Sequence, residues 1–321
     1  MAYYISCKSS LILMRHYIIL VTTILSFSDT LSSQISGKAL IGRWDLTISQ
    51  DDKQLPSWLE ITKSGHATLV GRFVYAFGSA RPIAQITLED DQFSFSIPNQ
   101  WESIGVMSFT GHVTGQGLSG MMTYVDGTEH NWSAKRAPTL ERSEPPIWGS
   151  KISLFNGENL NGWHVKGTNQ WKVEDGTLIN KKSGGNLVSD DVYDDFKLRV
   201  VFRYPEGSNS GVYLRGRYEV QIEDNYGQYP SNTLFGGIYG FLTPSELVAK
   251  PAGQWQEYQI MLVGRRVSII ANGKAIITDQ IIPGITGGAI DSDEGAPGPI
   301  LIQGDHGPIE FKVVEITPAI D

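Results

Sequence analysis

The sequence predicts an all-β protein built from two domains, and three observations carry that prediction. Apolar and polar residues alternate with a period of two over most of the chain, which is typical of strands with one buried face. Outside the N-terminal segment, no stretch of about 12 residues keeps a helical period without an interrupting Gly or Pro. The 35 Gly among 321 residues suit the tight turns of short strands, and the length favours two domains.

Residues 1–33 have the layout of a secretory signal peptide. Arg15 precedes an apolar run of 11 residues, YIILVTTILSF, and small residues follow near Ser32 and Ser33. A membrane-spanning helix needs about 20 apolar residues, so the run predicts export rather than a permanent span. We therefore expect a periplasmic or secreted protein. We also expect a bacterial origin, because the single cysteine, Cys7, lies in this segment and the rest of the chain can form no disulfide.

Residues 38–137 predict a small antiparallel β-barrel. About eight short strands follow one another in about 100 residues, joined by turns such as Asp126-Gly127, as in closed up-and-down barrels. Gly42-x-Trp44 in the first strand and Arg136 in the last resemble the G-x-W motif and closing Arg of lipocalin-like barrels. No group of ionisable residues converges here, so a packed accessory barrel is favoured over a ligand cup.

Residues 138–150 predict a Pro-rich linker. The period-two pattern stops there, and Pro138, Pro145 and Pro146 stiffen the backbone. The pattern resumes over residues 151–321, which form the second predicted domain.

An ordered series of short motifs covers residues 151–321. In chain order they are LFNGENLNGW, WKVEDGTL, NSGVYLR, RYEVQIEDNYG, GGIYG and LIQGDHGPIEFKVVEI. Together they resemble the 3-keto-disaccharide hydrolase family, a former domain of unknown function with a concanavalin A/laminin-G-like jelly roll. The resemblance implies a jelly-roll β-sandwich, and an activity on glycosides that have been oxidised at C3.

A polar face runs along the odd positions between Asn209 and Glu223. These positions hold Asn209, Gly211, Tyr213, Arg215, Arg217, Glu219, Gln221 and Glu223, whereas Val212, Leu214, Val220 and Ile222 are even. Side chains alternate between the two faces of a strand, so one face is polar and the other apolar. A solvated outer face is the ordinary interpretation. A sugar site is the alternative, because planar polar groups bind hydroxyl pairs and an aromatic ring covers C–H surfaces.

A second polar cluster follows the apolar strand that starts at Ile300. Gln303, Asp305 and His306 lie there between glycines, which let the backbone approach a ligand closely. His306 is either a site residue or a loop cap bonded to backbone.

The chemistry implied by the resemblance needs three groups. A ketone at C3 acidifies the C2 proton, so a base can remove it, the C1 substituent leaves, and water adds to the enone. This requires a base, a stabiliser of the enolate oxygen and an acid for the leaving group. The predicted catalytic residues are Glu219, His306 and Arg215, and the predicted substrate-binding residues are Arg217, Gln221, Asp224, Asn186, Tyr213, Gln303 and Asp305. Glu219 or His306 is the base or acid, an Arg polarises the ketone, and Asp224 joins only if the strand ends or bulges beside it.

Cofactor and partner predictions are limited. The acidic stretch Asp291–Gly295 is similar to a calcium loop but lacks the Gly and Glu that such a loop requires, so a solvated acidic turn is favoured over a Ca²⁺ site. A divalent ion remains an alternative to Arg as the electrophile.

The net charge of −8 without a basic run disfavours nucleic acid as a partner, leaving a small carbohydrate. An upstream sugar 3-oxidoreductase is implied. The competing functions are a non-catalytic carbohydrate-binding module and a structural surface protein.

Overall fold

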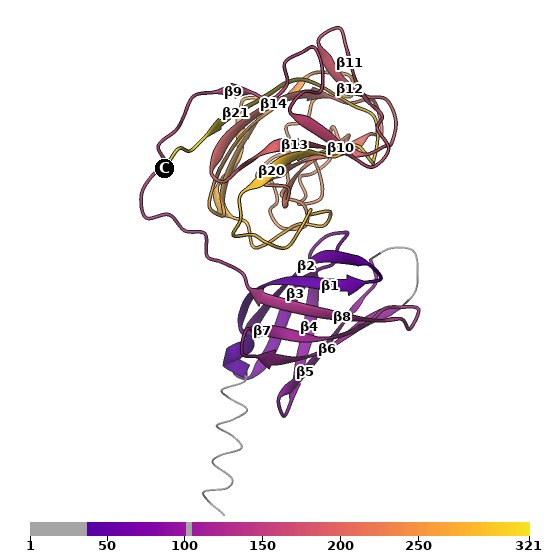
Figure 1. Ribbon diagram of the computed structural model, residues 1–321, viewed down its shortest axis with the longest axis vertical. Helices are drawn as coiled ribbons and strands as arrows, with labels where there is room; N and C mark the ends of the chain where they lie inside the picture. Colours follow the sequence, from indigo (N-terminus) through magenta and orange to yellow (C-terminus); the bar gives the residue numbers. More distant parts are fainter. Residues whose placement is uncertain (1–36, 101–104) are drawn as a thin grey trace, which may run out of the picture.

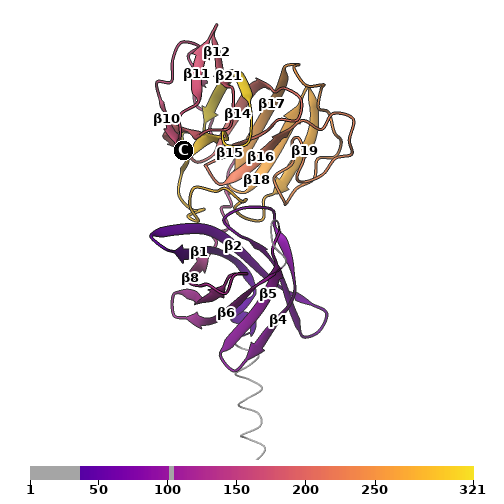
Figure 2. The same cartoon turned by 90° about the vertical axis from the view of Figure 1, so that its right-hand side faces the viewer.

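The computed structural model describes residues 37–100 and 105–321, and the signal peptide predicted at residues 1–33 lies outside them. Two β domains lie end to end, with the barrel beneath the sandwich in the orientation of Figure 1, and Figure 2 shows the same arrangement from the side. The predicted all-β class, a barrel followed by a jelly-roll sandwich, is confirmed. No helix in the described part of the chain is long and apolar enough to cross a membrane.

The N-terminal domain is a closed barrel in which each strand pairs with the next and the last returns to the first. Its strands are β1 (Gly42–Gln50), β2 (Lys53–Ser64), β3 (Thr68–Val74), β4 (Arg81–Glu89), β5 (Gln92–Pro98), β6 (Val106–Thr114), β7 (Gly117–Thr123) and β8 (Glu129–Arg136). Alternation along β5 and β6 buries Phe93, Phe95 and Phe109, and the rings of Phe95 and Phe109 stack at 4.6 Å. Aromatic side chains therefore occupy the barrel interior, as expected of an accessory barrel.

The residues that resemble the lipocalin motif close one end of the barrel. The Arg136 guanidinium lies 3.8 Å from the centre of the Trp44 ring and donates a hydrogen bond to the Ile41 carbonyl at 2.6 Å. Gly42 has a φ of 134°, and a Cβ there would collide with Arg136. Gly, Trp and Arg at these positions thus hold β8 against the start of β1.

The C-terminal domain is a sandwich of two antiparallel sheets. One sheet has the order β10 (Trp163–Lys166), β13 (Asn186–Tyr193), β20 (Gly298–Ile302), β15 (Asn209–Leu214) and β16 (Tyr218–Glu223). The other has the order β11 (Trp171–Glu174), β12 (Thr177–Asn180), β21 (Ile309–Pro318), β14 (Phe196–Arg203), β17 (Gln256–Val263), β18 (Arg266–Ala271) and β19 (Lys274–Ile281), with β9 (Ile152–Ser153) beside β21. Val212 and Val220 of the first sheet meet Phe202 and Phe311 of the second in one core. The face of the first sheet that points away from this core lines a cavity shared with the barrel.

The two domains share part of this core. Trp58, on β2 of the barrel, is fully buried and belongs to the hydrophobic cluster of the sandwich. Its ring meets Phe241 edge to face at 5.3 Å, and a Cβ on Gly284 would lie 2.5 Å from its Cδ1. A buried Trp in a close-fitting slot contributes apolar burial of the size seen inside a domain. The barrel is therefore packed onto the sandwich through a buried apolar contact.

A buried ion pair lies at the same junction. Arg265 donates to Glu294 Oε1 at 2.7 Å and to the Pro138 carbonyl at 2.9 Å, and Tyr218 also donates to Glu294 at 3.0 Å. Asp45, on barrel strand β1, is buried beside them, and burial together with the Glu294 charge raises the pKa of Asp45 to about 9. Asp45 is thus protonated at neutral pH, so it adds no further negative charge beside the Arg265–Glu294 pair.

Candidate active site

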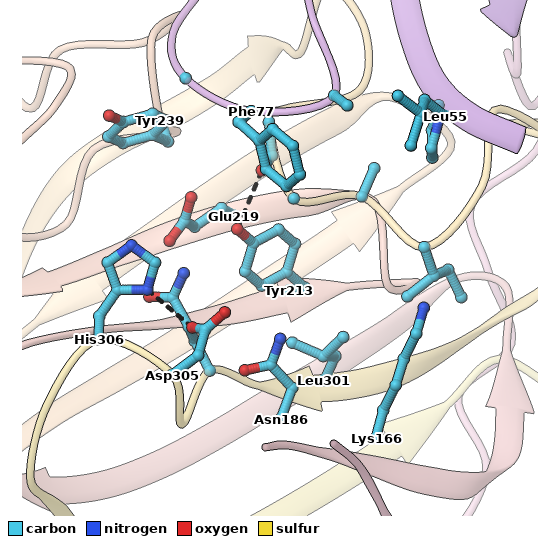
Figure 3. Close-up of a pocket in the computed structure, with 18 of the residues that line it drawn as sticks. Leu55, Phe77, Lys166, Asn186, Tyr213, Glu219, Tyr239, Leu301, Asp305 and His306 are labelled. Atoms are coloured by element: carbon cyan, nitrogen blue, oxygen red, sulfur yellow. Dashed lines mark hydrogen bonds and ion pairs between the residues drawn. The ribbon is translucent and has the colours of Figure 1, made fainter. Parts of the chain in front are cut away.

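A cavity of about 860 Å³ lies where the outer face of the first sheet meets the barrel (Figure 3). Seven of the ten predicted site residues line it: Asn186, Tyr213, Glu219, Gln221, Gln303, Asp305 and His306. The other three, Arg215, Arg217 and Asp224, do not. The volume is within the range of pockets that hold drug-sized ligands, which is also the size of a disaccharide.

The polar face is a hairpin, and its register explains why the odd positions stay together. Tyr213 on β15 pairs with Glu219 on β16, and Gly211 pairs with Gln221. Odd residues therefore lie opposite odd residues, so the polar side chains of both strands share one face. The even residues of both strands point into the sandwich core. Within the two strands, odd-numbered residues therefore stay on the same face of the sheet on both sides of the turn.

The structure corrects the assignment of Arg215. Arg215 and Gly216 have φ values of 52° and 65° and form the tight turn of the hairpin, which ends the strand alternation. The Arg215 side chain is fully buried, donates to Asp194 Oδ1 at 3.0 Å, and also donates to the Gly264 carbonyl. Its guanidinium points away from the cavity, so it cannot polarise a ketone there.

Arg217 is also committed elsewhere. Its guanidinium donates twice to Asp291, at 2.7 and 3.0 Å, and once to the Ala296 carbonyl at 2.9 Å. In the same acidic turn Asp293 accepts from Lys135 of the barrel at 2.8 Å, and Glu294 is paired with Arg265. No three His, Cys, Asp or Glu side chains of the described residues form a metal-binding group. The acidic turn is therefore an ion-paired junction that does not fit Ca²⁺.

Asp224 lies just beyond β16 and does not join the site. Its Oδ2 accepts the Gly207 backbone N–H at 2.9 Å, and its own N–H donates to the Ser208 carbonyl at 3.0 Å. The side chain closes the loop before β15 instead of contacting a ligand. The strand ends at Glu223, which was one of the two conditions set for Asp224 to join the site, but its side chain does not line the cavity.

Glu219 is a buried carboxyl that faces the cavity and has a strongly shifted pKa. It is 4% exposed, and burial raises its pKa to about 8, while the positive charge of His306 lowers it and the negative charge of Asp305 raises it. The Gln221 amide, in the orientation that satisfies both of its polar atoms, donates to Glu219 Oε1 at 3.1 Å and to the Ser210 carbonyl at 3.1 Å. In Figure 3 the carboxyl lies between Tyr213, Tyr239 and His306. It is held in place but not neutralised by a cation in direct contact.

His306 stands at the mouth of the cavity beside Glu219. Its Nδ1 lies 2.7 Å from Asp305 Oδ1, and this hydrogen bond, with the nearby negative charges, raises the pKa of His306 above its usual value. The imidazole therefore keeps a proton at higher pH than a free histidine does. The loop-cap alternative does not describe it, because its partner is the neighbouring carboxylate.

The glycines of this turn serve packing and not ligand approach. A Cβ on Gly304 would lie 2.9 Å from Trp171 Nε1, and the Gly304 N–H and carbonyl are bonded to Asn186 Oδ1 and Asn180 Nδ2, each at 2.8 Å. The turn is thereby fixed against the sheet. Gln303, 7% exposed, lines the cavity, and its Oε1 has no hydrogen-bond partner among the described residues. A ligand hydroxyl would satisfy it.

The cavity also contains residues that the sequence pattern did not single out. They are Tyr239, Lys166 and Leu301 of the sandwich, the loop 287–290, and barrel residues 53–56 and 76–78. Burial raises the pKa of Tyr239 to about 12, so its hydroxyl stays protonated. In the barrel sequence, the only hint of a site residue was Phe77, which precedes Gly78 in the turn-like segment AFGSA. No period-two pattern connects this segment to the polar face of the sandwich.

We expect Gly211→Ala to reduce turnover by about 100-fold while leaving the fold intact, because small misplacements of a reacting group cost that much. A Cβ at Gly211 would lie 2.9 Å from Glu219 Cγ and would collide with its carboxyl oxygen. Steady-state kinetics with thermal unfolding will measure both effects. Gly115→Ala is the matched control, because nothing lies within 4 Å of a Cβ there. Unchanged kcat/KM in Gly211→Ala would contradict the placement of Glu219.

Comparison with known proteins identifies relatives of the sandwich. A 3-keto-disaccharide hydrolase of Bacteroides thetaiotaomicron is 23% identical over 150 residues, which is 35% of this chain and 52% of that protein. The chain thus spans about half the length of this relative.

Two solved structures of candidate glycosyl hydrolases from Parabacteroides distasonis are also similar. One is 25% identical with a TM-score of 0.46, covering 55% of this chain and 92% of the other. The second is 26% identical with a TM-score of 0.42, covering 52% and 98%. The model of the 3-keto-alpha-glucoside-1,2-lyase-like domain matches residues 150–317, more than half of the chain. The protein therefore belongs to the 3-keto-alpha-glucoside-1,2-lyase-like family, as the ordered motifs of residues 151–321 predict.

Proposed function

We propose that this protein cleaves 3-keto-glycosides by removing the C2 proton, eliminating the C1 substituent and hydrating the resulting enone. The observation that carries the proposal is Glu219: a carboxyl that faces the cavity, is nearly fully buried, and has its pKa raised to about 8. A general base works best when its pKa is close to the working pH. A binding module has no use for a carboxyl whose ionisation is this costly.

Glu219 is the proposed base and proton carrier. Its carboxylate takes the C2 proton, and the C2–H electrons form the enolate with the C3 carbonyl. The enolate then collapses, the C1–O bond breaks, and the leaving oxygen takes the proton from the newly formed Glu219 carboxylic acid. Water adds its hydroxide to C1 and a proton to C2, so the net reaction is hydrolysis. A pKa of about 8 suits a group that both accepts and returns a proton near neutral pH.

His306 is the proposed stabiliser of the enolate oxygen. With Arg215 and Arg217 turned away, the protonated imidazole is the cationic donor beside Glu219, and Asp305 holds it by a 2.7 Å hydrogen bond. A preorganised donor at the position where negative charge develops lowers the barrier most. Gln303, the residue after β20, and Asn186, the first residue of β13, are the proposed contacts for the sugar hydroxyls.

The test is turnover of a synthetic 3-keto-glucoside compared with the same glucoside left unoxidised. The proposal predicts cleavage of the oxidised substrate only, and a slower rate when C2 carries deuterium. Binding of unoxidised oligosaccharides without turnover of any keto-sugar would instead establish a carbohydrate-binding module. Equal cleavage of both substrates would indicate the paired-carboxylate mechanism of ordinary glycosidases. Each outcome separates the proposed reaction from one competitor.

We expect a bell-shaped pH dependence of kcat/KM. Below about pH 8 Glu219 takes up a proton and the rate falls, because its pKa is raised to about 8. The rate also falls as the pH rises through the pKa of His306, which its hydrogen bond to Asp305 raises, because the imidazole then loses its proton. His306→Gln should lose about 100-fold in kcat and the alkaline limb, but keep the acid limb. An acid limb near the ordinary pKa of Glu would contradict the role of Glu219.

The proposed setting is outside the cytoplasm, and the signal-like layout of residues 1–33 supports it. The reaction also requires a separate sugar 3-oxidoreductase, since Glu219 and His306 carry out no redox step. Detection of the protein in the periplasmic or secreted fraction would test the setting.

A further inference from the structure

The wall of the cavity opposite the sandwich sheet comes from the barrel. Barrel residues 53–56, where β2 begins, and 76–78, which follow β3, line the same cavity as Glu219. In Figure 3 Phe77 and Leu55 lie across from Tyr213 and Leu301, on the ribbon of the N-terminal domain. These residues lie outside the family match at 150–317. Part of the site is therefore supplied by a domain that is separate from the family domain.

Close backbone contact holds this wall in position. The Gly288 N–H donates to the Ala76 carbonyl at 2.8 Å, and a Cβ at Gly287 would lie 2.6 Å from Gly78 N. No side chain fits between the two loops, so their spacing is set by main chain. This backbone contact and the buried Trp58 together fix the distance between the barrel wall and the sheet. A wall fixed in this way can contribute to recognition without first being ordered by a ligand.

The wall and the opposite floor differ in chemistry. Phe77 is 62% exposed, its ring centre lies 6.3 Å from that of Tyr75 in an edge-to-face arrangement, and half-buried Leu55 also lines the cavity. The floor offers Gln303 Oε1, which has no partner among the described residues, and the Asn186 amide. An aromatic face opposite polar groups suits a ring with an apolar C–H face and a hydroxylated edge.

The cavity extends well beyond the groups that carry out the reaction. Glu219, His306 and Tyr239 lie together at one end in Figure 3, and Leu55 and Lys166 lie at the other, with Phe77 between. An oxidised ring over Glu219 therefore leaves room for a second ring under Phe77. Lys53, Gln54 and Lys166 supply polar groups around that second position, which favours a hexose over a purely apolar ring.

We propose that the barrel wall is the leaving-group subsite, in which Phe77 stacks on the second hexose of a keto-disaccharide while Glu219 acts on the oxidised ring. This inference rests on the proposed function and adds to it a role for the N-terminal domain. Phe77 is a specificity-determining residue in it, and not a catalytic one.

The test compares three 3-keto-glucosides, whose leaving groups are a hexose, 4-nitrophenol and methanol, on wild type and Phe77→Ala. Loss of the stacking ring should lower kcat/KM for the hexosyl substrate about tenfold, through KM, and leave the methyl substrate unchanged. Phe77→Tyr should restore the hexosyl rate. Tyr229→Ala is the control, because Tyr229 is a 92% exposed aromatic outside the cavity. Thermal unfolding should show all variants folded, since Phe77 is mostly exposed.

The outcomes separate this inference from the proposed function. If wild type cleaves the methyl substrate but Phe77→Ala leaves the hexosyl substrate unaffected, the reaction stands and the subsite is wrong. Equal losses on all three substrates would also overturn the subsite, because they indicate damage to the reacting end. A loss confined to the nitrophenyl substrate would assign the wall to aromatic leaving groups instead. If wild type cleaves none of the three, the proposed function fails and the inference fails with it.

Discussion

Replacing Glu219 with Gln should reduce kcat on a 3-keto-glucoside by about a thousandfold, the usual contribution of a general base. Gln keeps the size and the hydrogen-bonding capacity of the side chain but cannot take the C2 proton. The carboxyl faces the cavity, whereas Glu223, the other carboxyl of β16, does not line it and so cannot replace Glu219. Steady-state kinetics on purified protein will measure the loss, and KM should change little.

The same variant should be at least as stable as wild type. The pKa of Glu219 in the folded protein, about 8, lies above the ordinary value of 4.5, so the protein loses stability as the pH rises from about 4.5 to 8. Gln removes that loss, and thermal unfolding at pH 8 should show a higher Tm for Glu219→Gln. Glu223→Gln is the matched control, because Glu223 lies on the same strand face but does not line the cavity. Near-normal turnover by Glu219→Gln would exclude it as the base.

Replacing Arg265 with Met should destabilise the protein by about 3–5 kcal/mol, the cost of leaving a buried carboxylate without its partner. Glu294 is fully buried and accepts hydrogen bonds from Arg265 and Tyr218. Arg265 also holds the Pro138 carbonyl at the start of the linker, so the barrel and sandwich lose a shared anchor. Chemical denaturation followed by tryptophan fluorescence will measure the change.

Arg266→Met provides the control for that experiment. Arg266 is the next residue, but its partner Asp279 and its own side chain are both more than half exposed. An exposed pair contributes about 0–1 kcal/mol, so its loss should be small. If the two variants unfold at the same denaturant concentration, the junction does not depend on the buried pair. If Arg265→Met loses activity under conditions in which all of the protein is folded, the junction also determines the geometry of the cavity.

The polar face of the site was predictable because strand alternation is a local property. Tyr213, Glu219 and Gln221 were placed on one face from a period of two, and the hairpin register preserves that period. Arg215 and Arg217 were misplaced because Gly216 between them makes a turn, and a turn rotates side chains out of the strand pattern. The glycine flanked by two arginines was the available signal.

The pairing of polar groups was less predictable, because it depends on distant segments. Arg217 and Asp291 are far apart in sequence, and so are Arg265 and Glu294. Acidic residues 291–294 suggested a solvated turn, whereas three barrel and sandwich cations neutralise them. No local pattern specifies which cation a carboxylate meets, because that depends on how loops pack.

The period-two pattern, the turns and the ordered motifs determined the all-β class, the two domains, the family and the polar strand face. These are local features, and each is decided by residues near one another in the chain. Only the tertiary structure decided that Glu219 is buried, that its pKa is raised, and that Phe77 of the barrel stands across the cavity from it. Burial and facing walls depend on the docking of the barrel against the sandwich, which brings together residues that share no local pattern.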